Sequence, residues 1–275
     1  MKKIKLIAMD CDGTLLNSEK HLTEYTRKVL EKAIKQGVVV LAATGRPDSG
    51  LPKEVLKIEG IKYAITSNGG RILDLKNNEI LLSKTLEQKE GTRLLKILAK
   101  YDTYKEVFFD GIGYGEKEKL DVIEEYVMDQ SMGPYLLNTR KPVEDLFDFI
   151  EKRNEPMDKI QAIFRKTEDR EQAGEEISEL IGREAIGALE NNIEINADGV
   201  NKAAAVLYLA EFLGIAREEV MTFGDAMNDI EMIQEAGIGV AMGNAVQKVK
   251  DAAYYITDTN DNNGVAKAIE KFVLS

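Results

Sequence analysis

The sequence predicts an α/β protein in which a parallel sheet is wound with crossover helices and is interrupted by an inserted α+β segment. Three observations support this class. Short apolar runs alternate with amphipathic stretches near both ends of the chain, these runs end in Asp, Thr-Gly or Gly-Asp, and the middle of the chain lacks such endings. Strands that alternate with helices indicate a parallel sheet, because each parallel crossover needs a long connection.

The N-terminal part contains three predicted strands that end in small or polar residues. The first covers residues 4–9, a short apolar run followed by Asp10. A helix is predicted over residues 23–35, with Thr23 as its N-cap and Gly37 just past its end. The two further strands cover residues 38–42 and 63–66, followed by Thr-Gly-Arg-Pro and Ser-Asn-Gly-Gly.

The same alternation returns near the C-terminal end, after a middle region of different texture. Predicted strands there cover 220–223, 238–241 and 254–256, and predicted helices cover 229–235 and 265–272. The middle region has amphipathic helices at 94–99, 146–151 and 173–180 and strands at 107–109 and 159–164. We therefore expect a discontinuous, Rossmann-like core of residues 1–84 and 192–275, with an α+β domain of residues 85–191 inserted into it.

Composition and charge exclude several classes of protein. Of the 275 residues, 44% are hydrophobic and 31% are charged, which is typical of a folded globular protein. The net charge of −11 argues against nucleic acid or an anionic membrane as a partner. The apolar run after the first lysines is too short for a signal peptide or a membrane span, and the single cysteine, Cys11, cannot form an internal disulfide. We expect a cytoplasmic protein, and the oligomeric state stays open.

Two acidic residues follow the first predicted strand. Residues two apart in an extended chain point the same way, so Asp10 and Asp12 face one side and Cys11 the other. One carboxylate can attack a phosphorus atom, and the other can protonate the leaving oxygen and later deprotonate water. Because close carboxylates repel each other, a divalent cation and a cationic side chain are needed to keep Asp10 ionised.

Candidate partners for these acids follow other predicted strands. Thr44 offers a hydroxyl and Gly45 a backbone amide, and both suit phosphate oxygens. Lys202 lies at a predicted helix start, where free amides also favour anions. Asp225 and Asp229, four residues apart, supply the hard carboxylates that Mg²⁺ prefers. His21, the single histidine, has no such partners and is interpreted as a surface residue.

Four motifs in this order resemble those of the haloacid dehalogenase (HAD) superfamily: Asp-x-Asp-Gly-Thr, Thr-Gly-Arg, a lone Lys, and Gly-Asp-x-x-Asn-Asp. The large insertion is similar to that of the Cof-type, subfamily IIB, sugar phosphatases. The resemblance runs from end to end and includes Ala-Met-Gly-Asn-Ala at 241–245 and Asn-Gly-Val at 263–265. It implies a Mg²⁺-dependent phosphatase that hydrolyses a small phosphorylated metabolite, such as a sugar phosphate, through an aspartyl phosphate.

The resemblance also implies a role for each candidate residue in the reaction. Asp10 would be the nucleophile and Asp12 the general acid and base. The inserted domain would be a mobile cap that closes over the site and chooses the leaving group. The residues implied to bind phosphate or substrate are Thr44, Gly45, Arg46, Asn68, Lys202 and Asn228. For Arg46 and Asn68, a supporting role without substrate contact is an equal alternative.

The implied metal site uses oxygen ligands from two loops. Asp10, the backbone carbonyl of Asp12, and Asp225 would hold Mg²⁺, with Asp229 in or near its coordination shell. Two residues depart from the family pattern. Cys11 stands where an apolar residue is more usual, and Ala203 follows Lys202 where this branch usually has Gly. The first should be tolerated because it faces away from the site, and the second leaves the lysine amine in place.

Two alternative functions use similar residues. A phosphomutase forms the same aspartyl phosphate and returns the phosphate to its substrate, and Asp12 does not distinguish it from a hydrolase. A phospho-receiver switch also combines acids, a Thr and a Lys around an acceptor Asp, but it would be about half this length and would lack the insertion.

Overall fold

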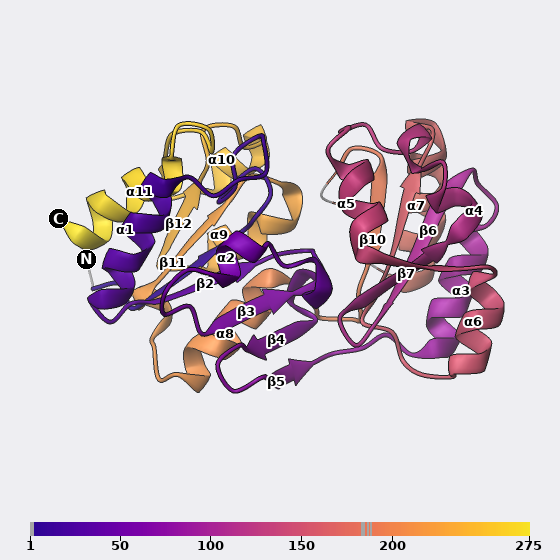
Figure 1. The fold of residues 1–275 in the computed structure, drawn as a ribbon, viewed down its shortest axis with the longest axis horizontal. Helices are drawn as coiled ribbons and strands as arrows, with labels where there is room; N and C mark the ends of the chain where they lie inside the picture. Colours follow the sequence, from indigo (N-terminus) through magenta and orange to yellow (C-terminus); the bar gives the residue numbers. More distant parts are fainter. Residues whose placement is uncertain (1–2, 183–184, 186, 188) are drawn as a thin grey trace. The chain divides into compact units, whose positions relative to one another are not determined.

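The chain forms two compact units. The computed structural model describes residues 3–182, 185, 187 and 189–275. The first unit comprises Met1–Arg46, Leu51–Ser83 and Gly199–Ser275, and the second comprises Pro47–Gly50 and Lys84–Asp198. Figure 1 shows that the strands of the first unit come from both ends of the sequence, so this unit is discontinuous.

The first unit is built on an eight-stranded sheet with the order β13-β12-β11-β1-β2-β3-β4-β5. Neighbouring strands are parallel from β13 to β3, and β4 and β5 are added antiparallel at one edge. The strands are β1 (Leu6–Met9), β2 (Val39–Ala43), β3 (Tyr63–Thr66), β4 (Arg71–Asp74), β5 (Glu79–Ser83), β11 (Val220–Gly224), β12 (Ile238–Ala241) and β13 (Tyr255–Ile256). The α-helices are α1 (Glu24–Lys35), α2 (Lys53–Leu56), α8 (Lys202–Phe212), α9 (Ile230–Glu235), α10 (Gln247–Ala252) and α11 (Gly264–Ile269).

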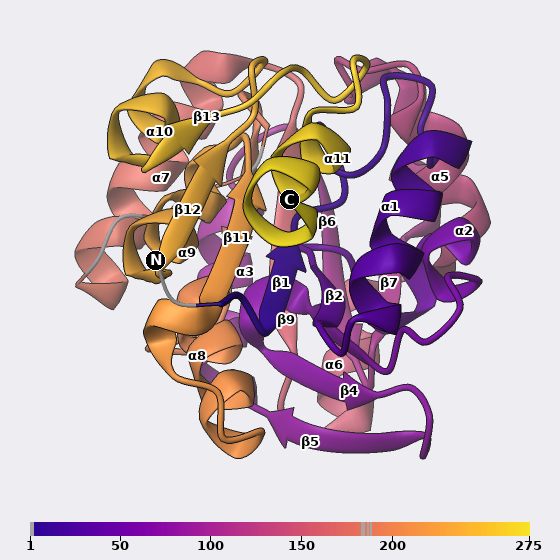
Figure 2. The same ribbon diagram turned by 90° about the vertical axis from the view of Figure 1, so that its left-hand side faces the viewer.

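The central strand β1 is apolar throughout because both faces of the sheet are covered. Leu6 and Ala8 belong to one apolar cluster, and Ile7 and Met9 belong to another on the opposite face. All four side chains are fully buried, as expected for a parallel strand between two helical layers. Figure 2 shows α11 in front of β1 and beside α1. The expected α/β class is confirmed.

Helix α1 illustrates how local sequence sets the boundaries of an element. The Thr23 side chain accepts a hydrogen bond from the backbone N–H of Thr26, which confirms the predicted N-cap. The chain leaves the helix through Gly37, whose φ of +88° is easily adopted only by glycine. Val29, Leu30 and Ala33 then turn the buried face of α1 toward the sheet.

The second unit is an α+β structure, also as expected. Its five-stranded sheet has the order β10-β9-β6-β7-β8, with antiparallel neighbours except for the parallel pair β7 and β8. The strands are β6 (Thr103–Phe109), β7 (Ile112–Glu116), β8 (Arg140–Val143), β9 (Lys159–Phe164) and β10 (Asn192–Ile195). The α-helices are α3 (Gln88–Leu98), α4 (Lys117–Leu120), α5 (Met132–Thr139), α6 (Leu146–Arg153) and α7 (Thr167–Ile181). Apolar residues of α3, α6 and α7 pack on one face of this sheet.

The boundaries of the units differ from those expected at two places. Residues 192–198 were expected in the core, but β10 pairs with β9 and so belongs to the second sheet. Residues 47–50 also belong to the second unit, where the backbone N–H of Ser49 donates to the carbonyl of Gly111 over 3.0 Å. Both differences depend on which distant strand or turn a short segment pairs with, and local sequence does not encode that.

Within the described part of the chain, every helix is too short or too polar to cross a lipid bilayer.

Cys11 provides a test of the packing after β1. Its side chain is fully buried, and burial, together with the nearby charge of Asp10, raises the pKa of the thiol well above its ordinary value. We predict that a thiol reagent reacts with the native protein at less than about one hundredth of the rate seen in denaturant, because the thiolate is the reactive form. Rapid reaction of the folded protein would contradict this placement.

Candidate active site

The candidate residues gather where the parallel strands of the first unit end. Because β11, β1, β2 and β3 are adjacent and parallel, their carboxyl ends lie at one edge of the sheet. Asp10 follows β1, Thr44 follows β2 and Asn68 follows β3. Asp225 follows β11. The backbone N–H of Asp10 donates to the carbonyl of Phe223 over 3.1 Å, which joins the start of the loop after β1 to the end of β11.

A lysine ammonium lies between two of the carboxylates. Lys202 Nζ donates to Asp10 Oδ1 over 2.6 Å and to Asp229 Oδ1 over 2.7 Å, and the Lys202 and Asp229 side chains are fully buried. Burial alone would lower the pKa of Lys202, but the charges of Asp10 and Asp229 raise it above its ordinary value. Lys202 therefore stays cationic and offsets the negative charge of the cluster.

Helix capping holds Lys202 in this position. Lys202 is the first residue of α8, and the side chain of its N-cap, Asn201, accepts a hydrogen bond from Ala204 N–H over 2.7 Å. Ala203, where the family pattern has Gly, is buried in the apolar cluster on one face of the sheet. The departure from the pattern thus leaves the lysine amine at the carboxylates.

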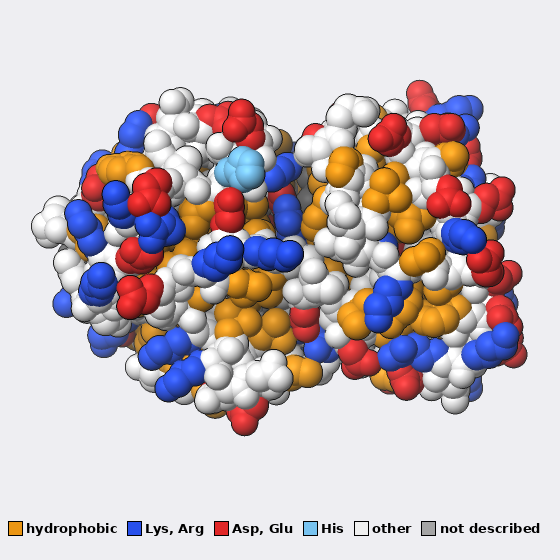
Figure 3. All heavy atoms as spheres, viewed as in Figure 1, with side chains coloured by type: hydrophobic (Ala, Val, Ile, Leu, Met, Phe, Trp, Pro, Cys, Tyr) orange, Lys and Arg blue, Asp and Glu red, His pale blue; other side chains and the backbone are white. Residues whose placement is uncertain are grey.

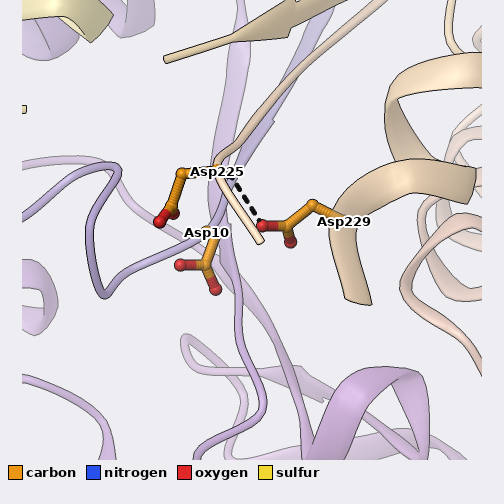
Figure 4. Close-up of side chains that lie close together, drawn as sticks. All are labelled: Asp10, Asp225 and Asp229. Carbon is orange, nitrogen blue, oxygen red and sulfur yellow. Dashed lines mark hydrogen bonds between the residues drawn. The ribbon is translucent and has the colours of Figure 1, made fainter. Parts of the chain in front are cut away.

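Asp229 links the lysine to the loop that carries Asp225. Its second oxygen, Oδ2, accepts hydrogen bonds from the backbone N–H groups of Asp225 (3.0 Å) and Ala226 (3.1 Å). Figure 4 shows this contact and the way in which the carboxylates of Asp10, Asp225 and Asp229 lie close together. Both oxygens of Asp229 are therefore already engaged, one by an ammonium and one by two amides.

Asp225 is held against the loop that follows β1. Thr14 Oγ1 donates to Asp225 Oδ1 over 2.7 Å. Gly13 has a φ of +77°, and a Cβ on Gly13 would lie 2.3 Å from Asp225 Oδ2, so only glycine fits there. Burial first, and then the charge of Asp229, raise the pKa of Asp225 to about 7. Burial also raises the pKa of Asp10, although the charge of Lys202 opposes this.

These carboxylates suit a divalent cation. Among the described residues, Asp10, Asp225 and Asp229 each offer a ligand atom, and these atoms all lie within 4.8 Å of one another. Hard carboxylate oxygens are the ligands that Mg²⁺ prefers, and a cation would oppose the effects of burial and of carboxylate repulsion that raise the pKa of Asp10 and Asp225. The residues present therefore fit a bound Mg²⁺.

The carboxylate of Asp12 is paired with the guanidinium of Arg46. The Arg46 guanidinium binds both oxygens of Asp12, with Nε to Oδ2 and Nη2 to Oδ1 both at 2.7 Å, and Lys20 Nζ lies 3.3 Å from Oδ1. Burial would raise the pKa of Asp12, but the hydrogen bonds and charge of Arg46 lower it below its ordinary value. From the sequence, contact with the substrate and a supporting role were equal alternatives for Arg46, and in this structure Arg46 contacts the carboxylate of Asp12.

The loops after β2 and β3 complete the site. Thr44 is buried, and its Oγ1 accepts a hydrogen bond from Arg46 N–H over 3.2 Å; Gly45 lies between these two residues. Asn68 has a φ of +56°, a left-handed conformation that is uncommon outside glycine and that clusters at functional sites. Asn228 Nδ2 donates to Asn68 Oδ1 over 3.2 Å, and in the described part of the chain Asn228 Oδ1 is buried with no hydrogen-bond partner.

Two contacts of the site were not expected from the sequence. Thr14 was included in the first motif but given no role, and it donates to Asp225. Asn244, part of the Ala-Met-Gly-Asn-Ala motif, donates from Nδ2 to the carbonyl of Gly13 over 2.8 Å.

His21 is exposed at the surface, as expected (Figure 3). Its Nδ1 lies 3.1 Å from Glu54 Oε1.

Comparison with known proteins identifies the family. Residues 7–269 match the family of haloacid dehalogenase-like hydrolases. The 5-amino-6-(5-phospho-D-ribitylamino)uracil phosphatase YcsE of Bacillus subtilis is 36% identical over 272 residues, which cover 98% of this chain and 96% of that protein. A haloacid dehalogenase-like hydrolase from B. subtilis has a similar structure, with a TM-score of 0.87, 28% identity and coverage of 98% and 100% of the two chains. A sugar phosphatase of HAD subclass IIB gives a TM-score of 0.83 at 25% identity, with 98% of both chains covered.

These similarities extend over nearly the whole chain, and they agree with the four motifs that meet at the carboxyl edge of the first sheet. The chain therefore belongs to the haloacid dehalogenase-like hydrolases, in their Cof-type branch, and is an enzyme of the phosphatase class.

Proposed function

We propose that this enzyme is a Mg²⁺-dependent phosphatase that hydrolyses a small phosphorylated metabolite through an aspartyl phosphate on Asp10. The observation that carries the proposal is the buried Asp10 carboxylate, held by the Lys202 ammonium at 2.6 Å beside Asp225 at the carboxyl edge of the sheet. A buried carboxylate with a raised pKa that is kept next to a cation is typical of a catalytic group.

The proposed reaction has two balanced steps. In the first, an oxygen of Asp10 attacks phosphorus, the bond from phosphorus to the leaving oxygen breaks, and Asp12 gives that oxygen a proton. In the second, Asp12 removes a proton from water, the water oxygen attacks phosphorus, and the bond to Asp10 breaks to release inorganic phosphate. Asp12 thus ends each cycle in its starting protonation state.

The contacts of Asp12 suggest how it is prepared for these steps. The bidentate pair with Arg46 fixes its carboxylate and favours the ionised form, which is the form that removes a proton from water. The proton donation of the first step requires Arg46 to loosen this grip. A bound phosphate is an alternative partner for the guanidinium, so we propose that Arg46 turns to the substrate during turnover.

The other loops would bind the phosphoryl group and the metal. Thr44, Gly45, Lys202 and Asn228 are proposed to hold its oxygens, because they supply a hydroxyl, a backbone amide, an ammonium and a side-chain amide at this edge. Asp10, the Asp12 carbonyl and Asp225 are proposed as Mg²⁺ ligands, and the ion would neutralise charge on the transferring group. We place Asp229 outside the direct ligands, since Lys202 and two backbone amides already occupy its oxygens.

The leaving group is proposed to be recognised by the second unit, acting as a cap. One face of its sheet carries polar side chains in register, with Glu106 opposite Gln161 and Gln161 opposite Glu194. Lys159 Nζ donates to Gln161 Oε1 over 3.1 Å and to Glu194 Oε2 over 2.7 Å. Buried ion pairs contribute little net stability, so a polar face of this kind suggests a binding role.

The relative YcsE suggests a first substrate to test. The 5-amino-6-(5-phospho-D-ribitylamino)uracil in its name is a phosphomonoester that carries several hydroxyls and amide groups. Such a leaving group would match the polar side chains of the second sheet, and sugar phosphates share its hydroxyl-rich character. Neither a phosphomutase nor a receiver switch is favoured, since YcsE and the similar subclass IIB protein are both named as phosphatases.

The nucleophile is tested by Asp10→Asn. We predict that this variant folds, but that its rate of Mg²⁺-dependent phosphate release falls more than about 10⁴-fold. A neutral amide cannot form the acyl phosphate. The measurement is phosphate release from a panel of phosphorylated metabolites, with circular dichroism as the check on folding. Asp121→Asn, an exposed residue of the second unit, should keep full activity. Wild-type rates from Asp10→Asn would refute the mechanism.

The electrostatics of the metal site predict a pH dependence in the presence of a chelator. The folded-state pKa of Asp225, about 7, exceeds the ordinary value for Asp, about 3.9. The stability that protonated Asp225 contributes is therefore present below about pH 4 and is lost as the pH rises through 7. We predict that Asp225→Asn melts at least about 3 °C above the wild type at pH 8, and that this gap narrows at pH 5.

Added Mg²⁺ should raise the melting temperature of the wild type at pH 8 but not that of Asp225→Asn. Asp121→Asn should behave as the wild type under all of these conditions. If the melting temperatures of the wild type and Asp225→Asn depended on pH in the same way, the pKa of Asp225 would not be raised in the folded protein.

The proposed role of the polar face is tested by Gln161→Ala. Loss of one hydrogen bond to the leaving group should lower kcat/KM for the preferred metabolite about tenfold. Hydrolysis of p-nitrophenyl phosphate, whose leaving group lacks those hydroxyls and amides, should change less than about twofold. Gln172→Ala, on the exposed side of α7, serves as the control. Equal losses for both substrates would argue against recognition by this face.

A further inference from the structure

One short loop holds the backbone of both loops that carry the proposed metal ligands. Residues 243–246 follow β12, the neighbour of β11 in the sheet. Asn244 Nδ2 donates to the carbonyl of Gly13 over 2.8 Å, and the backbone N–H of Val246 donates to the carbonyl of Asp225 over 3.0 Å. The loop after β1 and the loop after β11 are thereby tied to a common support.

Both polar atoms of the Asn244 side-chain amide form hydrogen bonds. Its Oδ1 accepts a hydrogen bond from the backbone N–H of Asn260 over 3.0 Å, which leaves Nδ2 directed at Gly13. Asn260 in turn donates from Nδ2 to the carbonyl of Leu16 over 3.0 Å, and its side chain is buried. The two asparagines therefore hold the loop of residues 10–16 at Gly13 and at Leu16.

Gly13 is the only glycine among residues 10–16, so its backbone is the one in this loop that no side chain of its own restrains. Gly13 cannot carry a side chain, because a Cβ would collide with Asp225, and glycine has the greatest backbone freedom of all residues. It lies directly between Asp12, whose carbonyl is a proposed ligand, and Thr14, whose hydroxyl binds Asp225 over 2.7 Å. Rotation about Gly13 would move both groups relative to Asp225.

We infer that Asn244 is a positioning residue for the Mg²⁺ site. By holding the Gly13 carbonyl it fixes the Asp12 carbonyl and the Thr14 hydroxyl in the arrangement that Asp225 requires. It touches neither the metal nor the substrate, and it acts through the peptide on either side of Gly13. This inference rests on the proposed function, because the site that Asn244 shapes is the proposed Mg²⁺ site.

The test is Mg²⁺ binding by Asn244→Ala, measured by titration calorimetry without substrate. Loss of a group that orients metal ligands weakens metal affinity about 10- to 100-fold, so a Kd for Mg²⁺ at least about tenfold above the wild-type value is expected. The Mg²⁺ concentration for half-maximal phosphate release should rise by a similar factor. At saturating Mg²⁺ the KM for the phosphorylated substrate should stay within about twofold, since Asn244 does not contact it.

Two further variants separate positioning from general stability. Asn244→Gln keeps the amide on a longer stem and should recover part of the Mg²⁺ affinity that alanine loses; it also provides the measurement if Asn244→Ala does not fold. Asn262→Ala is the matched control, because its side-chain amide donates to Thr259 Oγ1. Its Mg²⁺ affinity should equal that of the wild type.

The outcomes separate the inference from the proposed function. If the wild type binds Mg²⁺ and Asn244→Ala binds it equally well with only a lower melting temperature, Asn244 is structural and the inference is overturned. If the wild type itself binds no Mg²⁺, the proposed metal site fails and the inference fails with it. A selective loss of Mg²⁺ affinity in Asn244→Ala, with partial recovery in Asn244→Gln, supports both.

Discussion

The site depends on one buried ammonium group. Lys202 Nζ contacts Asp10 at 2.6 Å and Asp229 at 2.7 Å, in a place where carboxylates from three positions would otherwise repel one another. Two of these carboxyl groups have raised pKa values even with the lysine present. Breaking a buried pair by removing one partner is strongly destabilising, because it leaves a buried charge uncompensated. The folded chain can therefore bury this acidic cluster because Lys202 compensates its negative charge.

Close backbone packing gives this cluster its shape. Gly224 lies so near Asp229 that a Cβ would approach the Asp229 Cβ to 2.3 Å, and Gly13 is equally close to Asp225. Thr14 and the backbone amides of Asp225 and Ala226 then orient the carboxylate oxygens. Groups that are already oriented cost no reorganisation when charge develops during a reaction, which is the main source of electrostatic catalysis. The free energy spent on burying these acids is thus directed to function rather than to stability.

The sequence was sufficient for the fold class and for bringing the acids together, because both follow from periodicity and from strand ends. Asp10, Thr44 and Asp225 had to meet once β1, β2 and β11 were neighbours in a parallel sheet. The four motifs together also indicated the phosphatase class, through their resemblance to the haloacid dehalogenase superfamily.

Other features depend on pairings that one sequence does not encode. The partner of Arg46 follows from the course of two loops, and so its contact with Asp12 was not expected. Residues 192–198 were assigned to the core without a predicted strand, but β10 pairs with β9 in the second sheet. The edge strands β4 and β5 were not predicted, and β5 lacks the buried pattern that marks the central strands. Asn244 lay in a motif, but only its contact with Gly13 gives it a physical role.

The central claim is that Asp10 accepts the phosphoryl group, and mass spectrometry of acid-quenched enzyme tests it most directly. Acyl phosphates survive in acid, so enzyme mixed with Mg²⁺ and a turning-over substrate, then quenched within milliseconds and digested, should yield a phosphorylated peptide. The account predicts the added phosphate on Asp10, and its absence from the Asp10→Asn protein treated in the same way. Phosphate found on another residue, or release of inorganic phosphate with no labelled peptide at any quench time, would contradict the account.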